Sequence, residues 1–119
     1  MPAFMANTRR LHEAGAPMVA GTDAGIAPVK PHDAVRYAPA MLRQLGFSQA
    51  EALRAITSVA AEACGLAHRK GRIAPGFDAD ILVVDGDPIA DPDALHRIRT
   101  VYARGAAVSG SQPPGATAN

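Results

Sequence analysis

The sequence has no tryptophan, and its aromatic residues are limited to three phenylalanines and two tyrosines. These rings are scattered along the chain and offer no platform on which nucleic-acid bases could stack. The only cysteine is Cys64, so no disulfide can form within the chain and no thiolate metal cluster is possible. Because the neighbours of Cys64 in the sequence are apolar, we expect a buried, inert thiol.

The chain also lacks an excess of charge of one sign and a long apolar run. The net charge is +1, with acidic and basic residues well mixed, which argues against a nucleic-acid partner. No apolar run approaches the roughly 20 residues that a membrane-spanning helix needs, and the N-terminus lacks the apolar centre of a signal peptide. We therefore expect no membrane contact and a cytoplasmic location.

The sequence does contain enough apolar residues, 48% of 119, for the core of one small domain. A helix is predicted over residues 2–14, because Gly15 and Pro17 form a stop signal. The short apolar run at residues 18–21 predicts a strand buried on both faces. A loop rich in glycine and proline follows this strand.

Two further helices are predicted in the first 70 residues. One covers residues 32–45, and Pro39 should kink or split it near Ala38. The other opens with the capping-box pattern S-x-x-E at residues 48–51 and continues as a single helix to Gly65.

The composition changes at Gly71 toward β structure. Turn signals surround the β-rich run at residues 81–84, and a second β segment spans residues 98–103. We expect these two segments to pair antiparallel, with a last short strand at residues 106–109. The tail, residues 110–119, is predicted to be disordered.

Two stretches of the sequence resemble the amidohydrolase superfamily. The first is GTDAG, residues 21–25, which is similar to the end of that superfamily's eighth barrel strand. The second is GRIAPGFDADILVVDGDP, residues 71–88, which resembles the return to its small β-sandwich. Between them, EALRAITSVAAEACGL looks like the helices that follow strand eight. The metal-dependent hydrolases related to imidazolonepropionases and Xaa-Pro dipeptidases are the most similar.

The resemblance implies a fold and a division of the chain. The expected class is α/β: a C-terminal fragment of a (β/α)8 TIM barrel, with its last strand and helices, plus part of a small β-sandwich. Residues 1–70 would belong to the barrel and residues 71–109 to the β-sandwich. A complete barrel takes about 250 residues, so we expect a truncated gene product or a fragment.

The resemblance also implies a role for Asp23, the aspartate of GTDAG. In the family this residue ligates the catalytic metal, accepts a proton from the metal-bound water and passes it to the leaving nitrogen. A carboxylate suits both tasks, because it is a hard ligand and can cycle through its protonated form. The implied cofactor is a divalent metal, zinc, in the complete enzyme. The alternative is that Asp23 only caps or turns the chain.

The other metal ligands of the family are absent from the sequence, including its His-x-His pair. His12, His68 and His96 are expected to be ordinary surface residues. His32 is the only histidine near the expected barrel mouth, where it is either the N-terminal residue of a helix or a substrate contact. Lys30 has the same ambiguity. We expect no metal to be bound by this chain alone.

The remaining aspartates are predicted to lie in turns. Asp78 and Asp80 should accept hydrogen bonds from backbone N–H groups. A later series lacks the helix flanks and terminal glutamate of a calcium loop. It is therefore expected to be a solvated turn, and it comprises Asp85, Asp87, Asp91 and Asp93.

We therefore predict the C-terminal part of a metal-dependent amidohydrolase that hydrolyses a C–N bond in an amide, a cyclic amide or a dipeptide. Its partner would be a small-molecule substrate of the complete enzyme, and the isolated chain would be inactive. The alternatives are a non-catalytic remnant that only binds a partner and a split-enzyme subunit. Unpaired strand edges and exposed apolar helix faces favour a homo-oligomer or a complementing N-terminal chain.

Overall fold

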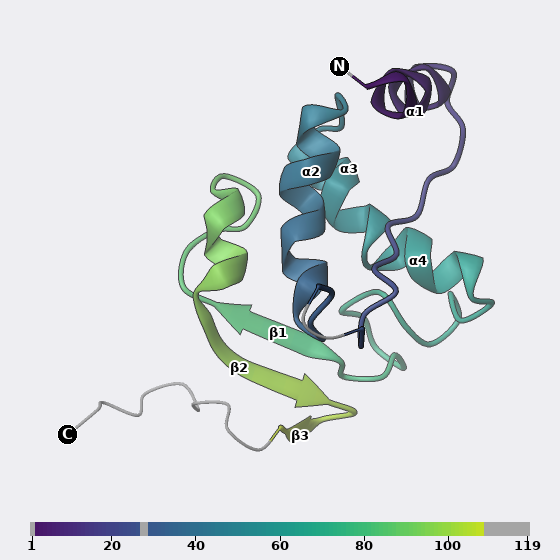
Figure 1. Cartoon of the computed structure of the whole chain (residues 1–119). Coiled ribbons are helices and arrows are strands. Elements are labelled where there is room, and N and C mark those ends of the chain that lie inside the picture. Colours follow the sequence, from purple (N-terminus) through teal and green to yellow (C-terminus); the bar gives the residue numbers. More distant parts are fainter. Residues whose placement is uncertain (1, 27–28, 109–119) are drawn as a thin grey trace.

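The computed structural model describes residues 2–26 and 29–108 of the chain. Its first part is helical, and its second part is a small antiparallel sheet (Figure 1). No helix within the described residues is long and apolar enough to cross a membrane. The helices before the sheet are α1 (Ala3–Glu13), the 3-10 helix η1 (Ala34–Tyr37), α2 (Ala38–Gln44), α3 (Gln49–Ala55) and α4 (Ser58–Ala63).

The first two predicted helices are confirmed with small changes. Helix α1 ends where the sequence predicts, and Gly15 adopts the left-handed conformation with φ 78°. The predicted helix over residues 32–45 is split at Ala38 into η1 and α2. The split has the expected cause, because Pro39 lies in the first turn of α2, where its missing N–H has no cost.

The predicted capping box of α3 is also confirmed. Ser48 Oγ accepts a hydrogen bond from the Glu51 N–H at 3.2 Å, and the Ser48 N–H donates to Glu51 Oε2 at 2.8 Å. The Ser48 N–H thereby lowers the pKa of the Glu51 carboxyl below its ordinary value. The helix therefore begins at the residue that the sequence indicates.

The prediction of one continuous helix to Gly65 is wrong. Helix α3 ends at Ala55 and α4 begins at Ser58. The cause is Thr57, whose Oγ1 donates a hydrogen bond to the Leu53 carbonyl at 2.8 Å. This is the carbonyl that the Thr57 N–H would use in a continuing α-helix, so the side chain competes with the backbone.

The predicted strand at residues 18–21 is wrong as well, because this stretch is extended but forms no ladder. Within the described residues, its one backbone hydrogen bond runs from the Ala20 N–H to the Ala55 carbonyl of α3 at 3.2 Å. A strand is defined by its hydrogen-bonded neighbours. Within the described part of the chain, no second extended segment lies alongside residues 18–21.

The core lies where α1, α2 and α3 meet. It is centred on the buried side chains of Leu45, Phe47 and Ala52. Partly buried side chains from three segments pack against this centre, and they are Met5, Met18 and Leu42. The extended stretch is therefore held by side-chain packing of Met18 against the helices rather than by a sheet.

The predicted antiparallel pairing in the second half is confirmed. Strand β1 (Ile81–Val84) pairs with β2 (Ile98–Ala103), and the 3-10 helix η2 (Pro92–His96) connects them. The last strand, β3 (Ala106–Ala107), pairs with the end of β2 and is shorter than predicted. Ser109 and the predicted disordered tail, residues 110–119, lie outside the described residues.

Gly71 lies close against the first part of α4 as the chain passes toward the sheet. It has φ 88°, and an added Cβ would lie 2.8 Å from the Cβ of Ala61 and 2.8 Å from the Thr57 carbonyl oxygen. Gly76 has a similar φ of 84°, but an added Cβ there would meet nothing within 4 Å. Alanine at position 76 would therefore introduce backbone strain alone, whereas alanine at position 71 would introduce both strain and steric overlap.

We predict that Gly71→Ala lowers the free energy of unfolding by about 2–4 kcal/mol, because left-handed strain adds to overpacking. Gly76→Ala should cost only about 1–2 kcal/mol, because strain alone remains. Urea unfolding followed by circular dichroism measures both. Equal losses in the two variants would contradict the close approach of residue 71 to α4.

Candidate functional site

Asp23 lies in the loop that follows the extended residues 18–21. Its backbone is left-handed, with φ 50°, a conformation that aspartate tolerates better than most residues. Just before it, Thr22 Oγ1 accepts a hydrogen bond from the Ala24 N–H at 3.1 Å, which tightens the turn. The Asp23 side chain is 88% exposed. Its carboxylate is therefore open to groups from outside the chain.

At Lys30 the chain comes back beside the residues that follow Asp23. The Gly25 N–H donates to the Lys30 carbonyl at 2.9 Å, and the Lys30 N–H donates to the Ile26 carbonyl at 2.7 Å. These bonds form a small antiparallel bridge between Ile26 and Lys30. As a result, Lys30 Nζ lies 3.5 Å from Asp23 Oδ2. The sequence left the role of Lys30 open, and the structure makes it the ion-pair partner of Asp23.

His32 is exposed and lies against the same loop. It occupies a turn before η1, so its predicted position at the N-terminus of a helix is wrong. A Cβ added to Gly25 would lie 3.3 Å from His32 Cε1, which places the imidazole beside the Gly25 backbone. Two of the sequence-predicted site residues, Asp23 and His32, thus belong to one loop.

The other histidines lie elsewhere. His68 and His96 are exposed, as predicted. The prediction for His12 is wrong, because its ring stacks on Phe47 with 3.7 Å between ring centroids and its side chain is only 20% exposed. Helix α1 packs its last turn over the core, so His12 faces Phe47 rather than solvent.

The prediction of a buried thiol at Cys64 is also wrong, because this residue is exposed. Cys64 directly follows the end of α4, and the residues on either side of it, Ala63 and Gly65, are exposed too. Apolar neighbours in the sequence predict burial only where another element covers them. Nothing in residues 2–26 and 29–108 covers this end of α4.

The described residues do not form a metal site by themselves. Across residues 2–26 and 29–108, no three His, Cys, Asp or Glu side chains are grouped closely enough to hold a metal ion. A catalytic zinc ion usually has about three protein ligands. Asp23 would supply one, so no reaction step follows from this chain alone.

One open groove of about 780 Å³ lies away from this loop. It runs between the end of α1, the extended segment, α3 and α4, and residues such as His12, Val19 and Arg54 line it. Neither Asp23 nor His32 contributes to it. The groove and the exposed loop that carries Asp23 are therefore separate features.

A model of the amidohydrolase family matches residues 2–109. The chain belongs to the amidohydrolase family. The resemblance seen in the sequence is thereby confirmed, and the family is metal-dependent. No curated protein matches the chain.

Several solved amidohydrolase structures are similar to the chain. A protein from Bifidobacterium longum assigned as a prolidase is 35% identical, with a TM-score of 0.80 over 92% of this chain and 27% of its own. A Xaa-Pro dipeptidase with bound methionine in its active site is 26% identical, with a TM-score of 0.80 over 92% of this chain and 26% of its own. Phenylurea hydrolase B is 29% identical, with a TM-score of 0.79 over 87% of this chain and 26% of its own. The chain therefore spans about a quarter of the length of these proteins, as a mixed α/β segment.

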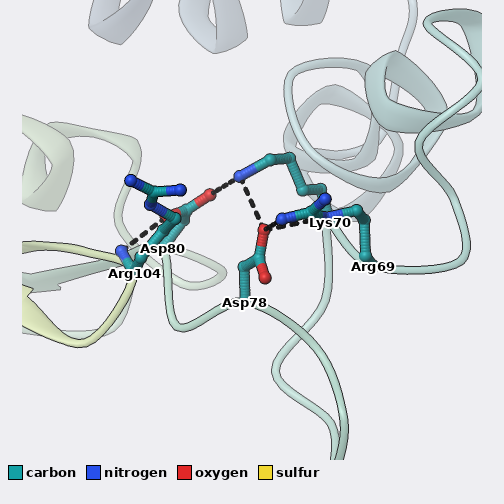
Figure 2. A network of polar contacts seen from close by, with 5 residues as sticks. All are labelled: Arg69, Lys70, Asp78, Asp80 and Arg104. Atoms are coloured by element: carbon teal, nitrogen blue, oxygen red, sulfur yellow. Dashed lines mark hydrogen bonds and ion pairs between the residues drawn. The ribbon is translucent and has the colours of Figure 1, made fainter.

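Two aspartates of the family-like DADIL stretch form a charged network instead of a site (Figure 2). Asp80 Oδ1 accepts a hydrogen bond from the Arg104 N–H at 2.9 Å, as predicted for this residue. The prediction of backbone partners for Asp78 is wrong: Asp78 Oδ2 accepts from Arg69 Nη2 at 2.8 Å and lies 3.0 Å from Lys70 Nζ. Arg69 and Lys70 follow α4 and were missed, because their separation in sequence from Asp78 gives no local signal.

Lys70 bridges the two carboxylates of this network. Its Nζ lies 2.6 Å from Asp80 Oδ2 and 3.0 Å from Asp78 Oδ2. These hydrogen bonds raise the pKa of Lys70 above its ordinary value, and the Lys70 ammonium lowers the pKa of both carboxyls below theirs. The network thus joins the end of the helical part to the turn before β1.

The turn prediction for the later aspartates is confirmed in part: Asp85 and Asp87 lie in the turn region after β1, whereas Asp91 caps η2 and Asp93 lies within it. Asp87 Oδ1 accepts from the Ile89 N–H at 2.8 Å, and Asp91 Oδ1 accepts from the Asp93 N–H at 3.0 Å. Asp85 pairs with the side chain of Arg99. These contacts fix the connection between β1 and β2.

We predict that Lys70→Met lowers the urea midpoint at pH 7 and that this loss shrinks at about pH 3. The folded-state pKa of Asp78 and Asp80 is depressed, so their contribution is present above the ordinary value of 3.8 and is lost as pH falls through the lowered pKa. The matched control is Arg10→Met on the exposed end of α1, which should change little at either pH. A Lys70→Met loss of the same size at both pH values would contradict the network.

Proposed function

We propose that this chain supplies the aspartate of an amidohydrolase active site that hydrolyses a C–N bond in an amide, a cyclic amide or a dipeptide. The observation that carries the proposal is the Asp23 carboxylate, which is 88% exposed on a loop of left-handed backbone directly after an extended segment. The family match over residues 2–109 supports it. The similarity to three solved structures, a protein assigned as a prolidase, a Xaa-Pro dipeptidase and a phenylurea hydrolase, supports it as well.

The proposal also assigns places in a larger fold. Residues 18–21 would be the last strand of a (β/α)8 barrel, residues 1–70 would belong to that barrel, and residues 71–109 to a small β-sandwich. A barrel delivers catalytic groups from the C-terminal ends of its strands. Asp23, two residues after the extended stretch, would occupy such a position in the complete barrel.

In this proposal Asp23 would have two tasks in the complete enzyme. Its carboxylate would be one ligand of a divalent metal, zinc, and the remaining ligands would come from parts of the fold that this chain does not contain. The metal, when bound, would supply the activation of water. Asp23 would accept a proton from the attacking water and give it to the leaving nitrogen. His32, beside Gly25 in the same loop, would contact the substrate.

A second candidate function is association with a complementing chain. It is favoured by the exposed apolar side chains around the loop, Val19, Ile26 and Val29. It is also favoured by the extended segment, which has one backbone hydrogen bond to α3 within the described residues. Exposed apolar groups and unpaired strand edges favour partners. A second copy of the chain, or a chain with the first barrel strands, could form backbone hydrogen bonds with the edge of this segment.

We predict the outcome in a chimera in which residues 2–108 replace the equivalent segment of the 35% identical protein from Bifidobacterium longum. Asp23→Asn should lower dipeptide turnover by about 10²–10⁴-fold, because an amide keeps an oxygen ligand but cannot accept the proton. Metal content, measured by atomic emission, should fall less than turnover.

The matched control in the chimera is Asp33→Asn. Asp33 is an exposed aspartate near the same loop, and its Oδ2 lies 2.6 Å from Arg36 Nη2. Its substitution should leave turnover close to that of the unchanged chimera. Near-normal turnover in Asp23→Asn would show that Asp23 is not the proton acceptor.

A further inference from the structure

The position of Lys30 beside Asp23 is set by the backbone. An ion pair between exposed side chains is too weak to fold a loop on its own, and here the lysine and aspartate side chains are 44% and 88% exposed. The two backbone hydrogen bonds that involve Lys30, at 2.9 and 2.7 Å, form without help from its side chain. The backbone hydrogen bonds therefore place the Lys30 ammonium near the Asp23 carboxylate without a contribution from the ion pair.

This arrangement gives Asp23 a counter-ion from within the chain. Lys30 is the only cation paired with Asp23 in the described residues. The next lysine or arginine along the chain, Arg36, is already paired with Asp33. A cation that approaches the Asp23 carboxylate from solvent meets a charge that is partly neutralised, and it is repelled by the ammonium 3.5 Å from Oδ2.

We propose that Lys30 is the internal counter-ion of Asp23 and competes with external cations for its carboxylate. The consequence for a catalytic metal rests on the proposed function: a metal that takes Asp23 as a ligand must first displace Lys30. The Lys30 side chain is half-exposed, so it can turn away into solvent while its backbone bonds stay in place. Lys30 is thus a positioning residue: its ammonium pairs with the Asp23 carboxylate until a cation that binds this carboxylate more tightly displaces it.

The test uses the 119-residue chain itself with Mn²⁺ as the probe. Paramagnetic broadening of amide signals in NMR spectra detects weak binding of Mn²⁺ at individual carboxylates. Glu13 and Glu62 serve as internal references, because both are exposed and the described residues give neither an ion pair. Broadening near Asp23 should be weaker than broadening near these references.

Three substitutions make the test specific. Lys30→Met should increase broadening at Asp23 by about two- to fivefold, the range expected for loss of an exposed ion pair. Lys30→Arg keeps the charge and should behave like the unchanged chain. Asp23→Asn should abolish the local broadening with either residue at position 30. In about 1 M salt the effect of Lys30→Met should largely disappear.

The proposal is overturned if Lys30→Met leaves broadening at Asp23 unchanged, or if Lys30→Arg gives the same increase as Lys30→Met. It is also overturned if Lys30→Met breaks the hydrogen bond from the Gly25 N–H to the carbonyl of residue 30, seen as rapid hydrogen exchange. The increase in Mn²⁺ broadening would then come from an opened loop. Failure here leaves the chimera experiment untouched. Conversely, an active Asp23→Asn chimera would end the proposed function without changing the Mn²⁺ result.

Discussion

The packing of α1, α2 and α3 around Leu45, Phe47 and Ala52 is the constraint on which the rest of the described structure depends. Met18 packs against this centre and so places the stretch that leads to Asp23. Residues 17–23 are exposed or half-exposed, and within the described residues their one backbone hydrogen bond to another element joins the Ala20 N–H to the Ala55 carbonyl at 3.2 Å. A barrel strand would instead be hydrogen-bonded to neighbouring strands. The similar solved proteins extend well beyond the quarter of their length that this chain matches, and we propose that the missing neighbours lie there.

The parts of the chain that stabilise the fold are separate from the loop that carries the proposed chemistry. The core around Phe47 and the Lys70 network hold the helices and the sheet, and neither includes Asp23. The loop after the extended segment depends on its own turn at Thr22 and on its own bridge to Lys30. Substitutions in the loop can therefore change its charge without changing the core.

Local signals in the sequence predicted the features that depend on a few neighbouring residues. The capping box at Ser48, the split at Ala38 and the antiparallel pairing of β1 with β2 all follow from residue types at short spacing. The break at Thr57 was missed because a hydroxyl–carbonyl bond within one turn leaves no mark on the apolar pattern.

Features that depend on distant parts of the chain could not be predicted in this way. Phe47 covers His12, Lys70 reaches Asp78 and Asp80, and nothing in the described residues covers Cys64. The strand expected at residues 18–21 failed for the same reason, because its partners are not in the described chain. For the candidate site, the resemblance supplied Asp23, whereas the pairing of Asp23 with Lys30 needed the backbone path of the loop.

The proposed function requires the Asp23 carboxylate of this segment to lie on the metal of an amidohydrolase site. A crystal structure of the zinc-loaded chimera tests it most directly, with the metal located by its anomalous scattering. The account predicts an Asp23 carboxylate oxygen about 2.0–2.2 Å from zinc, with the Lys30 ammonium turned away from that carboxylate. A zinc ion held by the host's ligands, with Asp23 outside bonding distance and still paired with Lys30, would contradict it.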